Sequence, residues 1–359
     1  MINGDEKQAR KTGRVAVQRP TGMSRKNRDM TDQDMSLAAR AAWLSYIGGL
    51  TQSDIASRLR VSPGKAHRLI AQAHENGLVK VFIEGAPDEC LELEAEIVDH
   101  FLIKNCVVAP SLTDDAEHNP QAEFKAVGSA AARFLHALIE KSDALMVGVG
   151  KGRSLAATVD NLPTLDRPDL KFVSVSGSLT RNLAANPFDV VHKLVERTGG
   201  EGYFLPVPYI AASVEEKELL LAQRSVQDML AKARQADLFV IGVGTVEGDA
   251  HVRQVGMVTE TEWQELTTLG AVGDVMGRFV DADGNAVASE VNEHSLGLTV
   301  DDLAGRRVVA VVGGAAKGDA IMAALKTGVI TDLVLGESSA RHIVDTLRRE
   351  TIEPKRKAG

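Results

Sequence analysis

Residues 308–325 read VVAVVGGAAKGDAIMAAL: five apolar residues, two glycines, a lysine and then a helix-forming segment. A similar order recurs in ALMVGVGKG (144–152) and DLFVIGVGTV (237–246). Short apolar strands that alternate with helices are typical of a parallel sheet covered on both faces. The sequence therefore predicts an α/β fold with a doubly wound, mostly parallel, Rossmann-like sheet.

The remaining elements of this region follow the same alternation. Further strands are predicted at 172–175 and 333–335, and helices at about 153–161, 188–198, 214–235, 316–326 and 338–349. One interruption is expected between residues 275 and 291, where Asp283-Gly284 has the composition of a hairpin turn.

The N-terminal region has a different pattern. Thr51-Gln-Ser-Asp54 resembles a capping box, and Ser62-Pro63 opens a further helix to Glu75, because Ser is a preferred N-cap and Pro is favoured at the first helical position. A helix is expected before them at 35–48, and the segment 78–84 alternates as a strand. Together these elements predict a winged helix-turn-helix, whose second helix enters the DNA major groove.

The distribution of charge supports contact with a polyanion. The chain carries a net charge of −8, yet residues 1–34 and residues 35–84 each carry +3, so that residues 85–359 carry −14. The alternative is a small helical bundle with a solvated polar face. The candidate DNA contacts lie at the helix starts and on the polar face of the second helix: Thr51, Gln52, Ser62, Lys65, His67, Arg68 and Gln72.

The composition limits the other classes of protein. The 359 residues are 44% hydrophobic and 25% charged, which indicates a globular protein of about two domains. No run approaches the ~20 apolar residues of a membrane span, and the first residues lack a secretory h-region. The two cysteines exclude a disulfide framework. We expect a cytoplasmic protein with no membrane segment, no metal site and no cofactor.

Glycines at the ends of the predicted strands indicate a ligand site. Ligands bind at the carboxyl ends of parallel strands, where backbone amides and helix N-termini favour an anion. Arg153, Ser154 and Lys317 suit a phosphate or a polyol, and Asp274 could accept hydrogen bonds from sugar hydroxyls. The alternative is that the glycines only form tight turns. A dinucleotide site is disfavoured because residues 148–154 lack a clean G-x-G-x-x-G.

Several segments resemble the SorC/DeoR-type sugar-binding transcriptional regulators. They are GLTQSDIASRLRVSPGKAHRLIAQAHENGLVKVFIEG (49–85), VGVGKGRSL (147–155), VSGSL (175–179) and GAVGDVMGRFVDADG (270–284), within a resemblance that covers about residues 36–349. The resemblance implies a DNA-binding domain joined to an effector domain related to sugar-phosphate isomerases. The sequence departs from the family pattern at Lys151, where an aromatic residue is common, and at Ser154 and Gly318, where Thr and Ala are common.

The resemblance also implies partners and site residues. It implies a regulator of a carbohydrate or polyol catabolic operon, expected to be a repressor, that binds double-stranded operator DNA and a sugar, polyol or sugar-phosphate effector as a homo-dimer or homo-tetramer. Arg181 and Arg253 enter the effector site by resemblance alone. The full set of expected effector contacts is Gly150, Gly152, Arg153, Ser154, Gly177, Ser178, Arg181, Gly242, Gly244, Arg253, Asp274 and Lys317.

The expected domain organisation has five parts. They are a disordered basic tail (1–34), a DNA-binding domain (35–85), a linker helix (86–104), an effector-binding and oligomerisation domain (105–350) and a disordered C-terminal tail (351–359). A misassigned start is the alternative for the first tail, since Met23, Met30 and Met35 could each begin translation.

Two other classes of function compete with a regulator. The first is a sugar-phosphate isomerase or deaminase with an N-terminal helix-turn-helix. General acid–base catalysis would need convergent carboxylates or a histidine, and only Asp274 is placed for this, so we expect no catalytic residue. The second, a structural nucleoid-binding protein, is disfavoured by the size of the C-terminal region.

Overall fold

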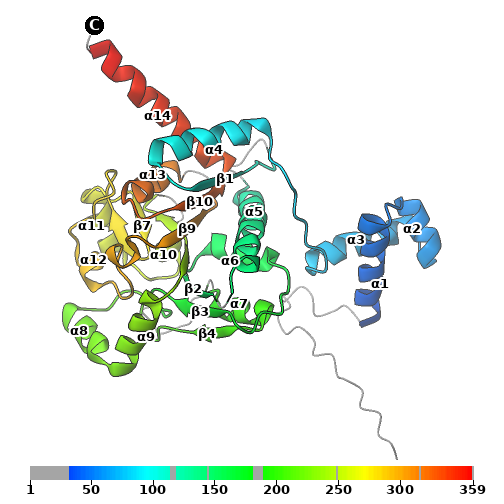
Figure 1. Ribbon diagram of the computed structural model, residues 1–359, viewed down its shortest axis with the longest axis horizontal. Coiled ribbons are helices and arrows are strands. Elements are labelled where there is room, and N and C mark those ends of the chain that lie inside the picture. The colour runs from blue at the N-terminus through cyan, green and yellow to red at the C-terminus, as the bar shows by residue number, and fades with distance from the viewer. Residues whose placement is uncertain are drawn as a thin grey trace, which may run out of the picture. The chain divides into compact units, whose positions relative to one another are not determined.

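The computed structural model describes residues 32–113, 119–143, 145–180, 189–247, 250–314 and 317–357 (Figure 1). The chain divides into two compact units, one ending at Val79 and one beginning at Lys80. We call the described residues of these units the head (32–79) and the body (80–357), and describe each by itself.

The head is a bundle of short helices. Its elements are α1 (Asp32–Ala42), the π-helical turn η2 (Trp43–Ile47), α2 (Gln52–Leu59) and α3 (Pro63–Glu75). Thr51 and Asp54 form the expected capping box, and the Ser62 hydroxyl caps α3 with Pro63 in its first turn. Ile55 and Leu69 pack with buried alanines of α1 and α3 to form the core. The helix-turn-helix prediction is confirmed.

The wing is not formed. Residues 78–84 contain no strand, contrary to the sequence prediction. A single strand leaves its backbone groups unpaired unless a second strand lies beside it. Along the body part of this segment, the carbonyls of Val81 and Ile83 instead accept hydrogen bonds from Ser129 Oγ (3.2 Å) and Arg133 Nη1 (2.7 Å).

The body contains the predicted parallel sheet. In spatial order its seven strands are β1 (Asn105–Ala109), β10 (Asp332–Gly336), β9 (Arg307–Val312), β5 (Leu238–Ile241), β2 (Met146–Val149), β3 (Lys171–Ser174) and β4 (Glu201–Tyr203). Every adjacent pair is parallel. All the carboxyl ends therefore lie at the same edge of the sheet.

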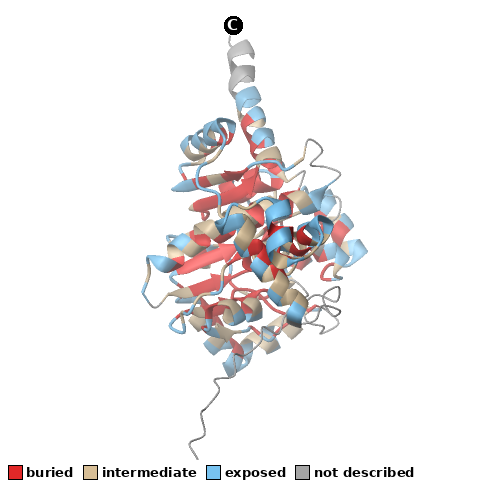
Figure 2. Cartoon of the chain, turned by 90° about the vertical axis from the view of Figure 1, so that its right-hand side faces the viewer, coloured by how far each residue is buried: buried red, intermediate tan, exposed pale blue. Residues whose placement is uncertain are grey.

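Helices cover both faces of this sheet. One face packs against α5 (Pro120–Glu140), α6 (Arg153–Asn161) and α7 (Val191–Thr198); the other packs against α4 (Asp88–Phe101), α9 (Arg224–Arg234), α13 (Gly318–Lys326) and α14 (Glu337–Lys357). Along β9, Val309 and Val311 face the first layer, while Val308 and Val312 face the second. This two-sided burial, visible as buried strands in Figure 2, explains the continuous apolar runs in the sequence.

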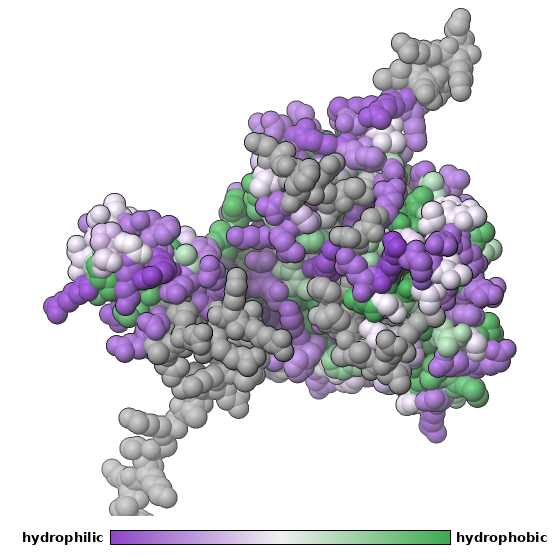
Figure 3. Space-filling model, turned by 180° about the vertical axis from the view of Figure 1, so that it is seen from behind, coloured by the Kyte–Doolittle hydropathy of each residue, from purple (hydrophilic) through white to green (hydrophobic). Residues whose placement is uncertain are grey.

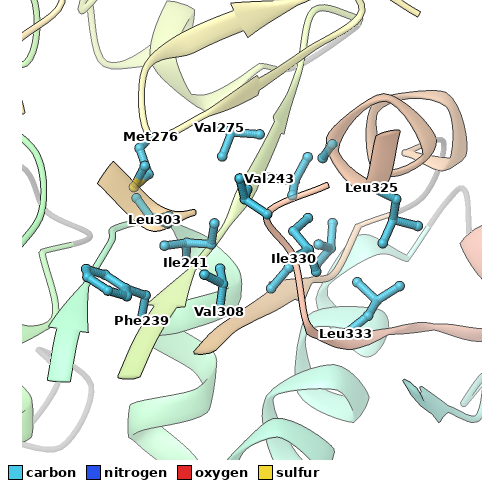
Figure 4. Packing of buried hydrophobic residues seen from close by; sticks show 14 of the residues in the cluster. Phe239, Ile241, Val243, Val275, Met276, Leu303, Val308, Leu325, Ile330 and Leu333 are labelled. Carbon is cyan, nitrogen blue, oxygen red and sulfur yellow. The ribbon is translucent and has the colours of Figure 1, made fainter. Parts of the chain in front are cut away.

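A small antiparallel sheet packs onto the large one. It consists of β6 (Val243–Thr245), β7 (Gly273–Val275) and β8 (Arg278–Val280). Val243 and Val275 share a core with Phe239 and Ile241 of β5 (Figure 4). The core therefore continues from the large sheet into the small one.

The expected interruption at 275–291 is present and antiparallel, and the turn predicted at Asp283-Gly284 follows a tighter turn that was not predicted. The turn between β7 and β8 is Met276-Gly277, where both residues have positive φ. Asp283-Gly284 forms a second turn, closed by a hydrogen bond from the Gly284 amide to the Asp281 carbonyl and followed by a bridge between Val280 and Ala286.

The remaining elements are short. They are α8 (Val214–Ala222), α10 (His251–Gln254), α11 (Glu260–Thr268), α12 (Glu290–His294) and the 3₁₀ turn η3 (Asp301–Leu303). The single helix predicted at 214–235 is broken at Gln223, whose backbone is extended (ψ 128°), so that it forms α8 and α9. Within the described residues, no helix combines the length and the apolar character that a membrane crossing requires.

Candidate functional site

A pocket opens at the carboxyl edge of the body's large sheet. It encloses about 750 Å³ of space between atoms, part of it open to solvent. Its walls are the β2–α6 turn, the segment that follows β5, strand β7 and the start of α13. Eight of the expected effector contacts line it: Gly150, Gly152, Arg153, Ser154, Gly242, Gly244, Asp274 and Lys317.

The β2–α6 turn brings a helix N-terminus to the pocket. Gly152 precedes α6 with φ 131°, a conformation that favours glycine because it has no Cβ. The buried Ser154 hydroxyl accepts a hydrogen bond from the Gly313 amide (2.9 Å) and so ties this turn to the end of β9. The Arg153 guanidinium lies 5.0 Å from the centre of the Phe124 ring. The turn therefore places a cation and the first amides of α6 at one end of the pocket.

The buried carboxylate of Asp274 lies on β7. Its Oδ2 accepts hydrogen bonds from the Gly277 amide (2.8 Å) and the Tyr209 hydroxyl (3.1 Å). Burial raises the pKa of Asp274, and these two donors and the charges of Lys317 and Lys151 oppose the rise. The other oxygen, Oδ1, occupies the space where a Cβ on Gly244 would stand.

Lys317 is the N-cap residue of α13. Its Nζ donates a hydrogen bond to the carbonyl of Val243 on β6 (3.1 Å). Burial and the positive charge of Arg153 lower its pKa to about 8, while Asp274 and Glu123 act in the opposite direction. The pocket thus holds an ammonium whose charge changes close to neutral pH.

Two functional candidates were not found from the sequence. Lys151 lines the pocket, donates a hydrogen bond from Nζ to the Gly177 carbonyl, and places that ammonium 4.6 Å from the centre of the Tyr209 ring. Burial also lowers the pKa of Lys151 to about 8. Lys151 lies inside the quoted glycine-rich motif, so the sequence did carry a signal for it. Tyr209 lies in an irregular segment without such a signal.

Four expected contacts are not part of the described lining. A Cβ on Gly177 would lie 2.0 Å from the Pro208 carbonyl oxygen, so this glycine permits a close approach of two backbones. Ser178 is buried next to Ser174 (Oγ–Oγ 3.2 Å). Arg253 pairs with Glu260 on the surface (2.8 Å). Arg181 lies outside the described residues. Their roles as effector contacts stay predictions.

The head presents its candidate DNA contacts on α2 and α3. Thr51, Gln52, Ser62, His67 and Arg68 are exposed, whereas Lys65 and Gln72 are half-buried. Gln52 Nε2 and His67 Nδ1 form a hydrogen bond (3.0 Å), so that these two side chains are held together across the two helices. The hydroxyls of Thr51 and Ser62 already cap their helices.

Comparison with known proteins identifies the family. Residues 86–345 match the Sugar-bind family, described as a sugar-binding domain. The chain is 40% identical, over 88% of its length and 98% of the relative's, to the erythritol catabolism regulatory protein EryD of Brucella abortus. This chain belongs to the Sugar-bind family of sugar-binding transcriptional regulators.

A further relative is also a transcriptional regulator, and a solved regulator structure has the same fold. The chain is 32% identical to the transcriptional regulator LsrR of an Enterobacter species, over 86% of this chain and 92% of that protein. The full-length sorbitol operon regulator SorC of Klebsiella pneumoniae has the same fold, with a TM-score of 0.60, 22% identity and coverage of 87% of this chain and 99% of that one.

The contact between Gly244 and Asp274 generates a prediction. In Gly244→Ala the new Cβ would lie 1.7 Å from Asp274 Oδ1, so the carboxylate must move and lose its bonds to Tyr209 and Gly277. We expect a loss of about 1–3 kcal/mol in the free energy of unfolding, and ligand affinity at least tenfold weaker.

Chemical denaturation and titration calorimetry measure these two effects. The matched control is Gly150→Ala in the same pocket, whose Cβ would have its nearest neighbour at 3.3 Å. If Gly244→Ala and Gly150→Ala bound the ligand with equal affinity, this would contradict a role of the Asp274 carboxylate in ligand binding.

Proposed function

We propose that the pocket of the body binds a sugar, polyol or sugar-phosphate effector that controls the affinity of the head for operator DNA. In this proposal the protein is a repressor of a carbohydrate or polyol catabolic operon. The observation that carries it is the convergence of Arg153, Lys317 and Asp274 at the carboxyl edge of the sheet. Cations next to a helix N-terminus suit a phosphate, and a carboxylate suits hydroxyls.

The domain roles belong to the same proposal. Residues 35–85 bind DNA, residues 86–104 connect the DNA-binding and effector domains, and residues 105–350 bind the effector and form the oligomer. Because α14 continues as helix through residues 351–357, the disordered C-terminal tail expected from the sequence is not part of this proposal. The most similar relative named above regulates erythritol catabolism. Erythritol and erythritol 4-phosphate are therefore the first effectors to test.

A thermal-shift screen of sugars, polyols and their phosphates tests the effector. A ligand that binds only the native state raises the apparent stability, by about 2.7 kcal/mol at a hundredfold excess over Kd. A screen in which no member of this class shifts the melting temperature would contradict the proposal.

The proposal includes the absence of catalysis. The relatives with curated names are transcriptional regulators, which supports this choice over an isomerase or deaminase. Incubation with aldose phosphates and amino-sugar phosphates should leave them unchanged. Turnover would favour the enzyme instead.

The DNA contact gives a second prediction. Arg68→Ala and Lys65→Ala should each weaken operator binding by about 1–3 kcal/mol if the side chain contacts a base, because both residues lie on the polar side of α3. Gel-shift titration at fixed salt measures the change, and Arg224→Ala, an exposed arginine on α9, is the control. Unchanged affinity in both head variants would exclude α3 as the reading helix.

A third prediction concerns assembly. One helix-turn-helix covers a half-site, so specific binding normally needs a dimer. Apolar side chains are exposed on α8, where Val214 is 39% and Leu219 71% exposed. Figure 3 shows hydrophobic atoms on the surface of the body. Light scattering at micromolar concentration should give a dimer or tetramer. A monomer that binds operator specifically would contradict this.

The fourth prediction concerns the response. Lys317→Ala should bind operator like the wild type without effector and should no longer respond to effector, since the ammonium next to Arg153 is the proposed anion contact. Fluorescence anisotropy of labelled operator, with and without effector, measures both properties. A variant that still responds at the effector concentration of the wild type would remove Lys317 from the site.

The fifth prediction is a pH dependence. A phosphate monoester is almost fully a dianion above pH 7, because its second pKa is near 6. Lys317, the proposed anion contact, has a pKa of about 8, so its positive charge is lost as the pH rises through 8. The affinity for a phosphorylated effector should therefore fall between pH 7 and pH 9.

Titration calorimetry at the two pH values measures this change. Lys317→Arg is the matched control, because a guanidinium stays charged throughout this range and should reduce the pH dependence. An affinity that is constant or increases between pH 7 and pH 9 would contradict an anionic effector at Lys317.

A further inference from the structure

We propose that Lys151 is a specificity-determining residue, whose ammonium and the Asp274 carboxylate bind one hydroxyl group of the effector from opposite sides. The inference rests on the proposed function of this pocket as the effector site. The glycine-rich edge and the Arg153 end of the pocket do not require a hydroxyl in the ligand. The proposed role of Lys151 adds this requirement, at a defined position in the ligand.

The position of Lys151 is fixed by the protein. Its Nζ donates to the Gly177 carbonyl and lies over the Tyr209 ring, 4.6 Å from the ring centre. Its backbone forms a bridge with Asp189, so the main chain is also held. An ammonium has three N–H donors, and the carbonyl of Gly177 takes one of them. The remaining donors are available at a wall of the pocket.

Tyr209 connects Lys151 to Asp274. The hydroxyl of Tyr209 donates its proton to Asp274 Oδ2 (3.1 Å), so that the tyrosine oxygen can only accept from a ligand. Lys151 and Asp274 both line the pocket and attract each other electrostatically, yet they form no ion pair within 4.0 Å. Both charged side chains therefore line one pocket without a direct ion pair, and the proposal places a ligand hydroxyl between them.

The wall of the pocket formed by Lys151, Tyr209 and Asp274 favours a hydroxyl group of the ligand. The wall offers a cationic donor on one side and two acceptors, the Asp274 carboxylate and the Tyr209 oxygen, on the other. A ligand hydroxyl accepts from Lys151 and donates to Asp274 at the same time, whereas a carbonyl can use only the lysine and a methylene can use neither. A ligand without the hydroxyl leaves buried polar groups unpaired, which is strongly unfavourable.

The second positive end of the pocket is formed by other residues than Lys151 and Tyr209. Arg153 is the cation that acts on Lys317, and both lie next to the N-termini of α6 and α13. An anionic group of the effector would bind there. A substitution at Lys151 should therefore change the recognition of the hydroxyl and leave the recognition of the anion in place.

Two phosphate esters test this separation. Erythritol 4-phosphate and n-butyl phosphate have four carbons and one phosphate, but only the first has hydroxyls. Titration calorimetry with the full chain would give both dissociation constants for the wild type, Lys151→Met and Lys151→Arg. We expect the wild type to prefer erythritol 4-phosphate at least tenfold, Lys151→Met to reduce this ratio to about threefold or less, and Lys151→Arg to keep most of it.

The affinity for n-butyl phosphate controls for folding, since it should be the same in the wild type and in Lys151→Met. A variant that loses affinity for both esters equally, with the ratio unchanged, would show a structural role for Lys151 and overturn the inference. An unchanged affinity for erythritol 4-phosphate would overturn it as well. A wild-type protein that binds neither ester would overturn the phosphorylated effector of the proposed function, and this inference with it.

Discussion

The buried carboxylate of Asp274 is the group on which the pocket depends. A charge removed from water is costly unless hydrogen bonds and opposite charges compensate for it. Here the Gly277 amide and the Tyr209 hydroxyl supply the hydrogen bonds, and Lys317 and Lys151 supply the charges. These partners come from four separate parts of the chain. The groups that compensate for this one buried charge thus connect the small sheet, the irregular segment around residue 209 and both glycine-rich turns.

The parts of this arrangement that follow strand ends could be predicted from the sequence. A strand buried on both faces is a short apolar run, and the turn after it needs glycine, so VVAVVGG and VIGVG locate the edge of the sheet. Arg153 and Lys317 were found because they follow such turns. Tyr209 was not found because it reaches Asp274 from 65 residues away in sequence, through a segment with neither periodicity nor glycine.

The elements that sequence reasoning missed or misplaced depend on contacts with distant segments. Residues 78–84 alternate like a strand but lack the neighbour that a strand requires. The helix α5 was not predicted, and much of its burial comes from close packing against α6: a Cβ on Gly128 would lie 2.8 Å from the backbone of Ala157. Small residues give a weak hydrophobic signal, because their burial depends on how closely the next helix approaches.

The free energy of one hydrogen bond can be compared with the free energy that the proposed response to the effector requires. Lys317 interacts with three parts of the body, since it is the N-cap residue of α13, is attracted by the charge of Asp274 and donates to the Val243 carbonyl on β6. A ligand can shift a conformational equilibrium only by its difference in affinity for the two states, typically about 1–3 kcal/mol. The hydrogen bond from Lys317 to the buried Val243 carbonyl contributes about 0.5–1.5 kcal/mol. An effector anion that binds Lys317 and Arg153 would therefore have to prefer one arrangement of β6 and α13 by more than this single hydrogen bond in order to control the response.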